Sequence, residues 1–115
     1  MPAQDLPADR KLRRRSEFQR VFDSGRRTHG RFFTVIAAAS PVPATRLGIV
    51  ASRKLGGAVV RNRAKRLIRE MFRTSVYDGP PLDLVVIPKN ALLTTDVEGL
   101  KREYATALKR CASKT

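Results

Sequence analysis

The sequence predicts a single small α+β domain whose helices cover one face of a β-sheet. Apolar residues recur at helical spacing in three segments, and short runs rich in Val, Ile and Phe lie between those segments. Pro and Gly separate most of these elements. With 115 residues, of which 42% are hydrophobic, the chain is long enough for one modest core.

The N-terminal boundary and the first helix come first along the chain. Residues 1–11 are rich in Pro, Ala and charge, so we expect a flexible tail there and one domain over residues 12–115. The first helix should begin at Ser16, which forms a capping-box pattern with Gln19, and should stop at Gly25.

Three or four strands are expected. The apolar run over residues 31–39 and the alternating segment over residues 45–52 flank two prolines, which favours a hairpin between them. Residues 26–29 are a candidate for a further short strand, and residues 82–87 form the last one.

The second helix, over residues 61–73, carries six basic residues and one acid. Its apolar residues still share one face, as in a helix that packs against a core. That face comprises Val60, Ala64, Leu67, Ile68 and Met71, whereas the opposite face holds Arg61, Asn62, Lys65, Arg66, Arg69 and Arg73. Such a one-signed row of charge favours a polyanionic partner.

The last helix is predicted to start after Thr95 or Asp96, either of which could cap it. Its apolar stripe consists of Val97, Leu100, Tyr104, Leu108 and Cys111. The predicted element order is therefore αβββαβα when the short strand is included.

The net charge of +14 is placed unevenly, because no Asp or Glu lies between Asp23 and Glu70. An acid-free, basic middle segment is typical of a nucleic-acid-binding surface. The chain has no apolar run of about 20 residues that could span a bilayer, and its one Cys forms no internal disulfide. We therefore expect a cytoplasmic protein.

The residues that could support catalysis are few. His29 is the only histidine and has no acidic neighbour in sequence, and Cys111 lies in an apolar stripe. Gly56 and Gly57 lack the ending of a nucleotide-binding loop, and no Cys/His set has zinc-binding spacing. The sequence thus predicts a binding surface without a catalytic residue or a protein-based metal site.

The binding surface would include Arg53 and Lys54, just before the basic helix. If about five phosphates are neutralised, log K should fall with log salt at a slope of about −4. Phe18 and Phe22 share a face of the first helix, and spacing leaves two roles open for them: core packing or stacking on unpaired bases.

Residues 52–72, S-R-K-L-G-G-A-V-V-R-N-R-A-K-R-L-I-R-E-M-F, strongly resemble the signature of the bacterial ribonuclease P protein family. The segment L-R-R-R-S-E-F-Q-R-V-F-D-S-G, the Arg-Phe strand start at residues 31–33 and the strand R-L-G-I-V-A-S are similar too. In all, the resemblance covers roughly residues 12–111.

This resemblance implies a mixed sheet with a left-handed βαβ crossover through the basic helix. It implies a protein subunit of ribonuclease P that binds the catalytic RNA and the 5′ leader of precursor tRNA. In that family the RNA performs hydrolysis with Mg²⁺ held mainly by RNA, while the protein raises substrate affinity and helps to position the metal ions. Membranes and DNA are not expected partners.

By matched position, the resemblance also implies which residues bind. The residues expected to contact RNA are Arg53, Lys54, Arg61, Asn62, Arg63, Lys65, Arg66 and Arg69. A leader cleft would be lined by Phe18, Phe22, Phe33 and Ile36. The family often has an aromatic residue where this chain has Ile36, so stacking is lost at that point.

Two alternatives are a ribosomal or rRNA-binding protein of similar build and a DNA-binding module that uses the basic helix in a major groove. The second alternative requires side chains that hydrogen-bond to base edges. Asn62 is the only typical adenine-binding side chain among the Arg and Lys residues, so the helix favours phosphate contacts.

Overall fold

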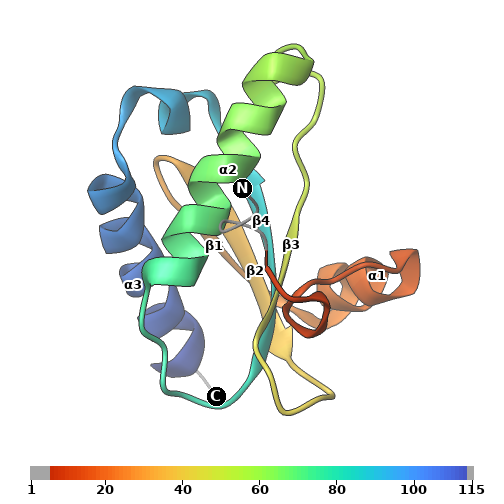
Figure 1. Ribbon diagram of the computed structural model, residues 1–115. Coiled ribbons are helices and arrows are strands. Elements are labelled where there is room, and N and C mark those ends of the chain that lie inside the picture. Colours follow the sequence, from red (N-terminus) through yellow and green to blue (C-terminus); the bar gives the residue numbers. More distant parts are fainter. Residues whose placement is uncertain (1–5, 114–115) are drawn as a thin grey trace.

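The computed structural model describes residues 6–113, which form three helices and a four-stranded sheet (Figure 1). The elements are α1 (Arg15–Ser24), β1 (Arg26–His29), β2 (Phe33–Ala39), β3 (Arg46–Ile49), α2 (Ala58–Thr74), β4 (Leu82–Pro88) and α3 (Val97–Ser113). Two short 3₁₀ turns, η2 (Ala8–Arg10) and η3 (Asn90–Thr94), complete them. The predicted α+β class and the order αβββαβα are confirmed, including the short strand β1.

The strand order in the sheet is β1-β2-β4-β3. Strand β4 runs antiparallel to β2 and parallel to β3, so the predicted hairpin between β2 and β3 is wrong. The reason is burial: Leu84, Val85 and Val86 are all fully buried, so side chains on both faces of β4 are covered. A strand covered on both faces takes an interior place in the sheet.

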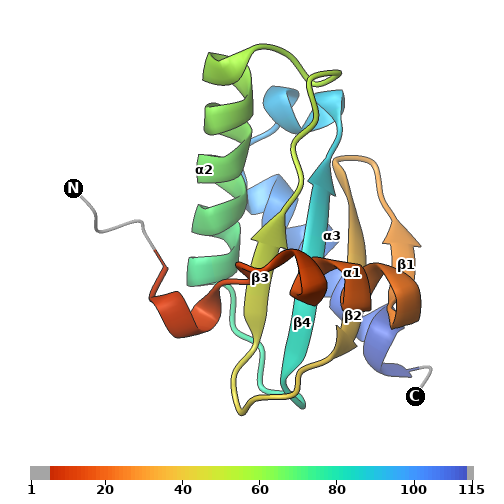
Figure 2. The ribbon, with the colours of Figure 1, turned by 90° about the vertical axis from the view of Figure 1, so that its right-hand side faces the viewer.

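The connection from β3 through α2 to β4 has the unusual hand. In Figure 2 both strands point upward with α1 in front of the sheet, and β4 lies to the right of β3. Helix α2 packs on the far face, so the crossover is left-handed, as predicted. Crossovers between parallel strands are right-handed in nearly all proteins.

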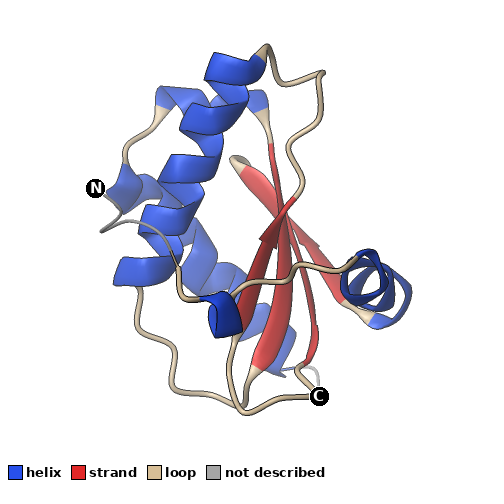
Figure 3. Cartoon of the chain, turned by 45° about the vertical axis from the view of Figure 1, so that its right-hand side comes forward, coloured by secondary structure: helices blue, strands red, loops and turns tan. Residues whose placement is uncertain are grey.

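The sheet carries helices on both faces, which corrects the expectation that the helices cover one face (Figure 3). Helices α2 and α3 cover one face over the main core, which includes Val35, Leu84 and Ile68. Helix α1 crosses the opposite face over a smaller cluster around Val21 and Ile36. None of the helices in residues 6–113 has the length and apolar character needed to cross a bilayer.

The segment that precedes α1 packs on the domain. Leu6 is buried in the main core, and the Leu12 amide donates to the Leu47 carbonyl at 3.0 Å. Arg10 Nε donates to the Thr45 carbonyl at 2.7 Å. Residues 6–11 therefore lie against the domain and do not form a free tail, because Leu6 is buried and Arg10 and Lys11 contact the β3 region. Residues 1–5 lie outside the described part of the chain.

Glu17, not Ser16, caps the N-terminus of α1. Glu17 Oε1 accepts hydrogen bonds from the amides of Arg13 at 2.7 Å and Arg14 at 2.9 Å. These two hydrogen bonds lower the pKa of Glu17 below its ordinary value of 4.5, and the bond from Arg14 has the larger effect. The nearby Arg46 guanidinium lowers this pKa further. The carboxylate also suits the positive end of the helix dipole.

We expect this cap to make the free energy of unfolding fall as the pH is lowered into the acid range. A carboxyl whose folded pKa is depressed stabilises fully above its unfolded value, here 4.5, and loses that contribution as the pH falls through the folded pKa. The stability of Glu17→Gln should therefore fall below that of the unsubstituted protein above pH 4.5, and the difference should shrink at lower pH. Urea unfolding at a series of pH values measures the free energy of unfolding of both proteins. A difference between them that stays the same at every pH would contradict the prediction.

Helix α3 begins with the second of its two candidate caps. Asp96 Oδ1 accepts a hydrogen bond from the Gly99 amide at 3.0 Å. The predicted stripe is confirmed at Leu100, Tyr104 and Cys111, which are buried in the main core. The thiol of Cys111 is thus a core group.

Candidate RNA interface

The turn before α2 depends on a glycine. Gly56 has φ of +150°, in the region that favours glycine, and a Cβ there would come within 2.9 Å of the Val60 side chain. Gly57 is the N-cap of α2 and makes no side-chain cap hydrogen bond to the first amides of the helix. Arg53 and Lys54 are exposed immediately before this turn.

Helix α2 buries one face and exposes its charge, as its pattern predicts. Ala64, Ile68 and Met71 are fully buried. On the other side Asn62, Arg63 and Arg66 are exposed, and Arg61, Lys65 and Arg69 are half-buried. Within residues 6–113, the ion pairs include none of these cations. Their charge is therefore left for a partner.

The cations of α2 point in two directions. Lys65 and Arg69 line a groove of about 180 Å³ between α2 and the N-terminal segment. Lys11 and Phe18 line the same groove, together with the backbone at Gly48. The basic helix and Phe18 of α1, which were predicted separately, thus meet in one groove, whereas Phe22 is not among the residues that line it. Lys11 was missed because its segment was assigned to the tail.

Phe18 and Phe22 lie half-buried on the outer side of the sheet. A Cβ at Gly48 would lie 2.5 Å from Phe18 Cε1, so glycine is what lets the Phe18 ring approach β3 so closely. The Arg27 guanidinium lies 5.7 Å from the centre of the Phe22 ring, in cation–π contact. Both rings are positioned to combine a packed edge with an accessible surface.

Two predicted cleft residues are placed differently. Phe33 is buried in the main core beneath α2 and α3, on the face opposite Phe18, so its place in the cleft is wrong. Ile36 faces the same side as Phe18 but has no exposed surface. Ile36 therefore belongs to the buried layer against which Phe18 and Phe22 pack. Side chains alternate along a strand, so residues 33 and 36 cannot share a face.

A cluster of charges joins α1 to the sheet. Asp83 of β4 is fully buried, and its Oδ1 and Oδ2 accept from Arg46 Nε at 2.9 Å and Nη2 at 2.7 Å. Arg20 Nη2 also donates to Asp83 Oδ2. Arg46 Nη1 then pairs with Glu17 Oε2 at 3.1 Å. The Asp83 carboxylate beside it raises the pKa of Arg46, which stays charged.

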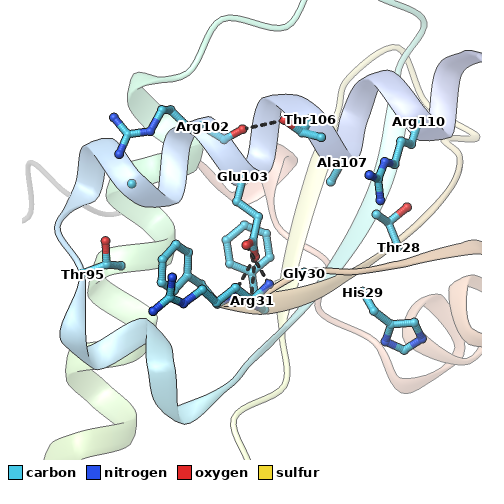
Figure 4. Close-up of a pocket in the computed structure, with 13 residues that line it drawn as sticks. Thr28, His29, Gly30, Arg31, Thr95, Arg102, Glu103, Thr106, Ala107 and Arg110 are labelled. Carbon is cyan, nitrogen blue, oxygen red and sulfur yellow. Dashed lines mark hydrogen bonds between the residues drawn. The ribbon is translucent and has the colours of Figure 1, made fainter.

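A second hollow, of about 500 Å³, lies between α3 and the turn that joins β1 to β2 (Figure 4). Glu103 reaches from α3 to this turn and accepts hydrogen bonds from the amides of Arg31 at 2.8 Å, Phe32 at 2.9 Å and Phe33 at 3.1 Å. A Cβ at Gly30 would lie 2.3 Å from the Glu103 carboxylate. Glu103 therefore holds the turn, and its oxygens are engaged by backbone amides.

Two further reactive side chains of the described residues are His29 and Cys111. His29 Nδ1 lies 3.2 Å from the Thr34 hydroxyl, and Cys111 is buried. Over residues 6–113, His, Cys, Asp and Glu form no group of three that could hold a metal ion. The described side chains thus do not fit a metal centre of their own. A basic helix, a charged groove and an aromatic ring beside it define a small α+β protein with a nucleic-acid-binding surface.

Comparison with known proteins identifies the family. Residues 6–112 match the family model for ribonuclease P. The ribonuclease P protein component of Desulfovibrio desulfuricans is 42% identical over 87 residues, which are 73% of this chain and 67% of that protein. That of an Exiguobacterium species is 40% identical over 101 residues, which are 84% and 89% of the two chains.

Solved structures agree with the sequence relatives. The ribonuclease P protein of Thermotoga maritima is 31% identical, with a TM-score of 0.74 over 87% of this chain and 96% of that one. A Staphylococcus aureus ribonuclease P protein mutant, described as defective in mRNA degradation activity, is 30% identical, with a TM-score of 0.77 over 88% and 86%. The chain belongs to the bacterial ribonuclease P protein family, the protein subunit of the endoribonuclease that matures the 5′ ends of tRNA.

Proposed function

We propose that this subunit binds ribonuclease P RNA through the exposed side of α2 and binds the 5′ leader of precursor tRNA through the groove beside Phe18. Membership of the family implies the RNA partner. The division of labour is supported by the two directions of the α2 cations: Arg63 and Arg66 are exposed, whereas Lys65 and Arg69 line the groove.

The residues that line the groove support the proposal that it binds the leader. A single strand needs a basic track for its phosphates and an aromatic platform for its bases. Lys11, Lys65 and Arg69 supply the cations of this groove, and Phe18 supplies the ring. The groove is lined by residues of α1, β3, α2 and the segment before α1, so a bound strand would lie over β3 with α2 on one side and α1 on the other.

Magnesium enters this proposal with the RNA. The residues of the interface are cations, an amide and aromatic rings, which are poor ligands for Mg²⁺ because it prefers oxygen donors. We propose that Mg²⁺ is held mainly by RNA phosphates and that the subunit acts on it only by fixing the RNA around it. The subunit would act in the cytoplasm with the RNA.

The experiment compares Phe18→Ala with the unsubstituted protein, each reconstituted with ribonuclease P RNA at low magnesium. Processing of precursor tRNA should be stimulated by the unsubstituted protein. Phe18→Ala should weaken binding of leader-bearing precursor roughly 5- to 150-fold, the equivalent of one stacked base, and leave binding of mature tRNA unchanged.

Phe32→Ala is the matched control, since Phe32 is a half-buried phenylalanine at the other edge of the sheet, in the Glu103 hollow. It should bind both RNAs as the unsubstituted protein does. Absence of stimulation by the unsubstituted protein would refute the proposed function. Equal weakening for precursor and mature tRNA would remove Phe18 from the leader site.

A further inference from the structure

We propose that the charge cluster of Glu17, Arg20, Arg46 and Asp83 is a positioning device that sets the place and rotation of α1 and thereby the leader affinity of the groove. This inference rests on the proposed function. It assigns to these four residues no contact with RNA. Their role would be to hold Phe18 where a leader base can stack on it.

The geometry of the cluster fixes α1 at two points. Glu17 and Arg20 are three residues apart on α1, and they meet Arg46 of β3 and Asp83 of β4 respectively. Arg20 also donates from Nη1 to the Ala39 carbonyl at the end of β2, at 3.1 Å. One helix is thus tied to three strands. Two attachments one turn apart restrain rotation about the helix axis as well as sliding along the sheet.

The aromatic residue lies directly beside these attachments. Phe18 follows Glu17 in sequence, and its ring lies against the sheet where β3 has Gly48 instead of a side chain. The gap there is so narrow that a Cβ would lie 2.5 Å from Phe18 Cε1. A small rotation of α1 would therefore press the ring into β3 or lift it out of the groove.

Charge is a costly way to attach a helix if stability is the only requirement. The Asp83 side chain is 0% exposed and that of Arg46 is 11% exposed, so both lose most of their hydration. Well-packed apolar residues in place of a buried ion cluster are often neutral or stabilising. Charged hydrogen bonds, unlike apolar contacts, are directional, and Arg46 donates to Asp83 through two nitrogens in a fork. The cluster therefore favours a defined orientation of α1.

The decisive experiment replaces the cluster by apolar residues and measures leader discrimination, the ratio of holoenzyme affinity for leader-bearing precursor to that for mature tRNA. The triple variant Arg20→Met, Arg46→Met and Asp83→Leu removes the three charges that meet at the buried Asp83 site. The Glu17 carboxylate, 24% exposed, keeps its hydrogen bonds from the amides of Arg13 and Arg14, so the variant should keep its thermal stability. Its leader discrimination should nevertheless fall about tenfold or more, the equivalent of losing one stacked base. Its affinity for the RNA subunit should not change, because α2 is untouched.

A second variant covers the case in which the triple variant does not fold. Arg20→Met keeps the Arg46–Asp83 pair, and the Arg20 side chain is 38% exposed, so folding should persist while discrimination falls. The control Glu70→Gln removes the Arg73–Glu70 pair on α2, 2.6 Å long, and should leave discrimination unchanged.

Each outcome decides the question. A stable variant with lost discrimination supports the positioning role, and a stable variant with full discrimination overturns it. Loss in Glu70→Gln of the same size would also overturn it. If the unsubstituted protein shows no leader discrimination, the proposed function itself fails, which is a different result from failure of the variants alone.

Discussion

Replacement of Asp83 by alanine should lower the free energy of unfolding by about 3–5 kcal/mol, the usual cost of removing one partner of a buried ion pair. The carboxylate is fully buried and accepts hydrogen bonds from Arg46 and Arg20. Arg20 is exposed enough to turn toward water, but the Arg46 side chain is only 11% exposed and would keep an unmatched charge near the core. Urea unfolding at neutral pH measures the loss.

Asp78→Ala is the control for this prediction, because Asp78 is exposed in the loop before β4. Its effect should stay within about 0.5 kcal/mol, as for most surface substitutions. A domain is typically stable by only about 5–15 kcal/mol in total, so the Asp83 variant should lose a large fraction of its free energy of unfolding. If Asp83→Ala changed the free energy of unfolding as little as Asp78→Ala, the Arg46 guanidinium would have to be hydrated in the Asp83 variant, and the prediction would be wrong.

The double substitution Arg63→Ala and Arg66→Ala should have the largest effect on RNA binding. Both side chains are exposed on α2, and neither belongs to an ion pair in the described part of the chain. If each contacts one phosphate, the slope of log K against log salt should become less steep by about 1.5. Titration of ribonuclease P RNA over a range of salt concentrations measures that slope, and thermal melting should be unchanged.

The matched control removes two charges from another helix. Arg102 and Lys109 are exposed on α3, and their replacement by alanine lowers the net charge by the same amount. That variant should keep the original salt dependence. Equal changes of slope in the two variants would mean that RNA senses only the overall charge, and the proposed place of α2 at the interface would then be wrong.

The sequence alone predicts the local elements well, because their patterns are local. The period of Ala64, Ile68 and Met71 identifies the buried side of α2, and the strand residues 26–29 match β1. The binding chemistry of α2 also follows from its order of cations. These features depend on neighbours a few residues apart, where helical and strand periods decide which side chains share a face.

The partners of these elements could not be predicted in the same way. The β3–β4 pairing joins Leu47 to Leu84 across an entire helix, and a short loop favoured the wrong hairpin. Leu6 gave no periodic pattern, so its burial was missed. Phe33 and Ile36 are three residues apart on one strand, so strand alternation alone places their side chains on opposite faces of the sheet.

The place of β4 in the sheet has a consequence for synthesis of the protein. Strand β4 lies between β2 and β3 but ends at Pro88, late in a chain of 115 residues. Until β4 has left the ribosome, β3 lacks the strand with which it pairs, and the main core lacks Leu84 and Val86. We therefore expect folding to wait for β4, which is synthesised after the basic helix, so that the helix is exposed to ribosomal RNA before the domain has formed. The basic helix of the nascent chain is therefore exposed to ribosomal RNA before the folded subunit can bind ribonuclease P RNA.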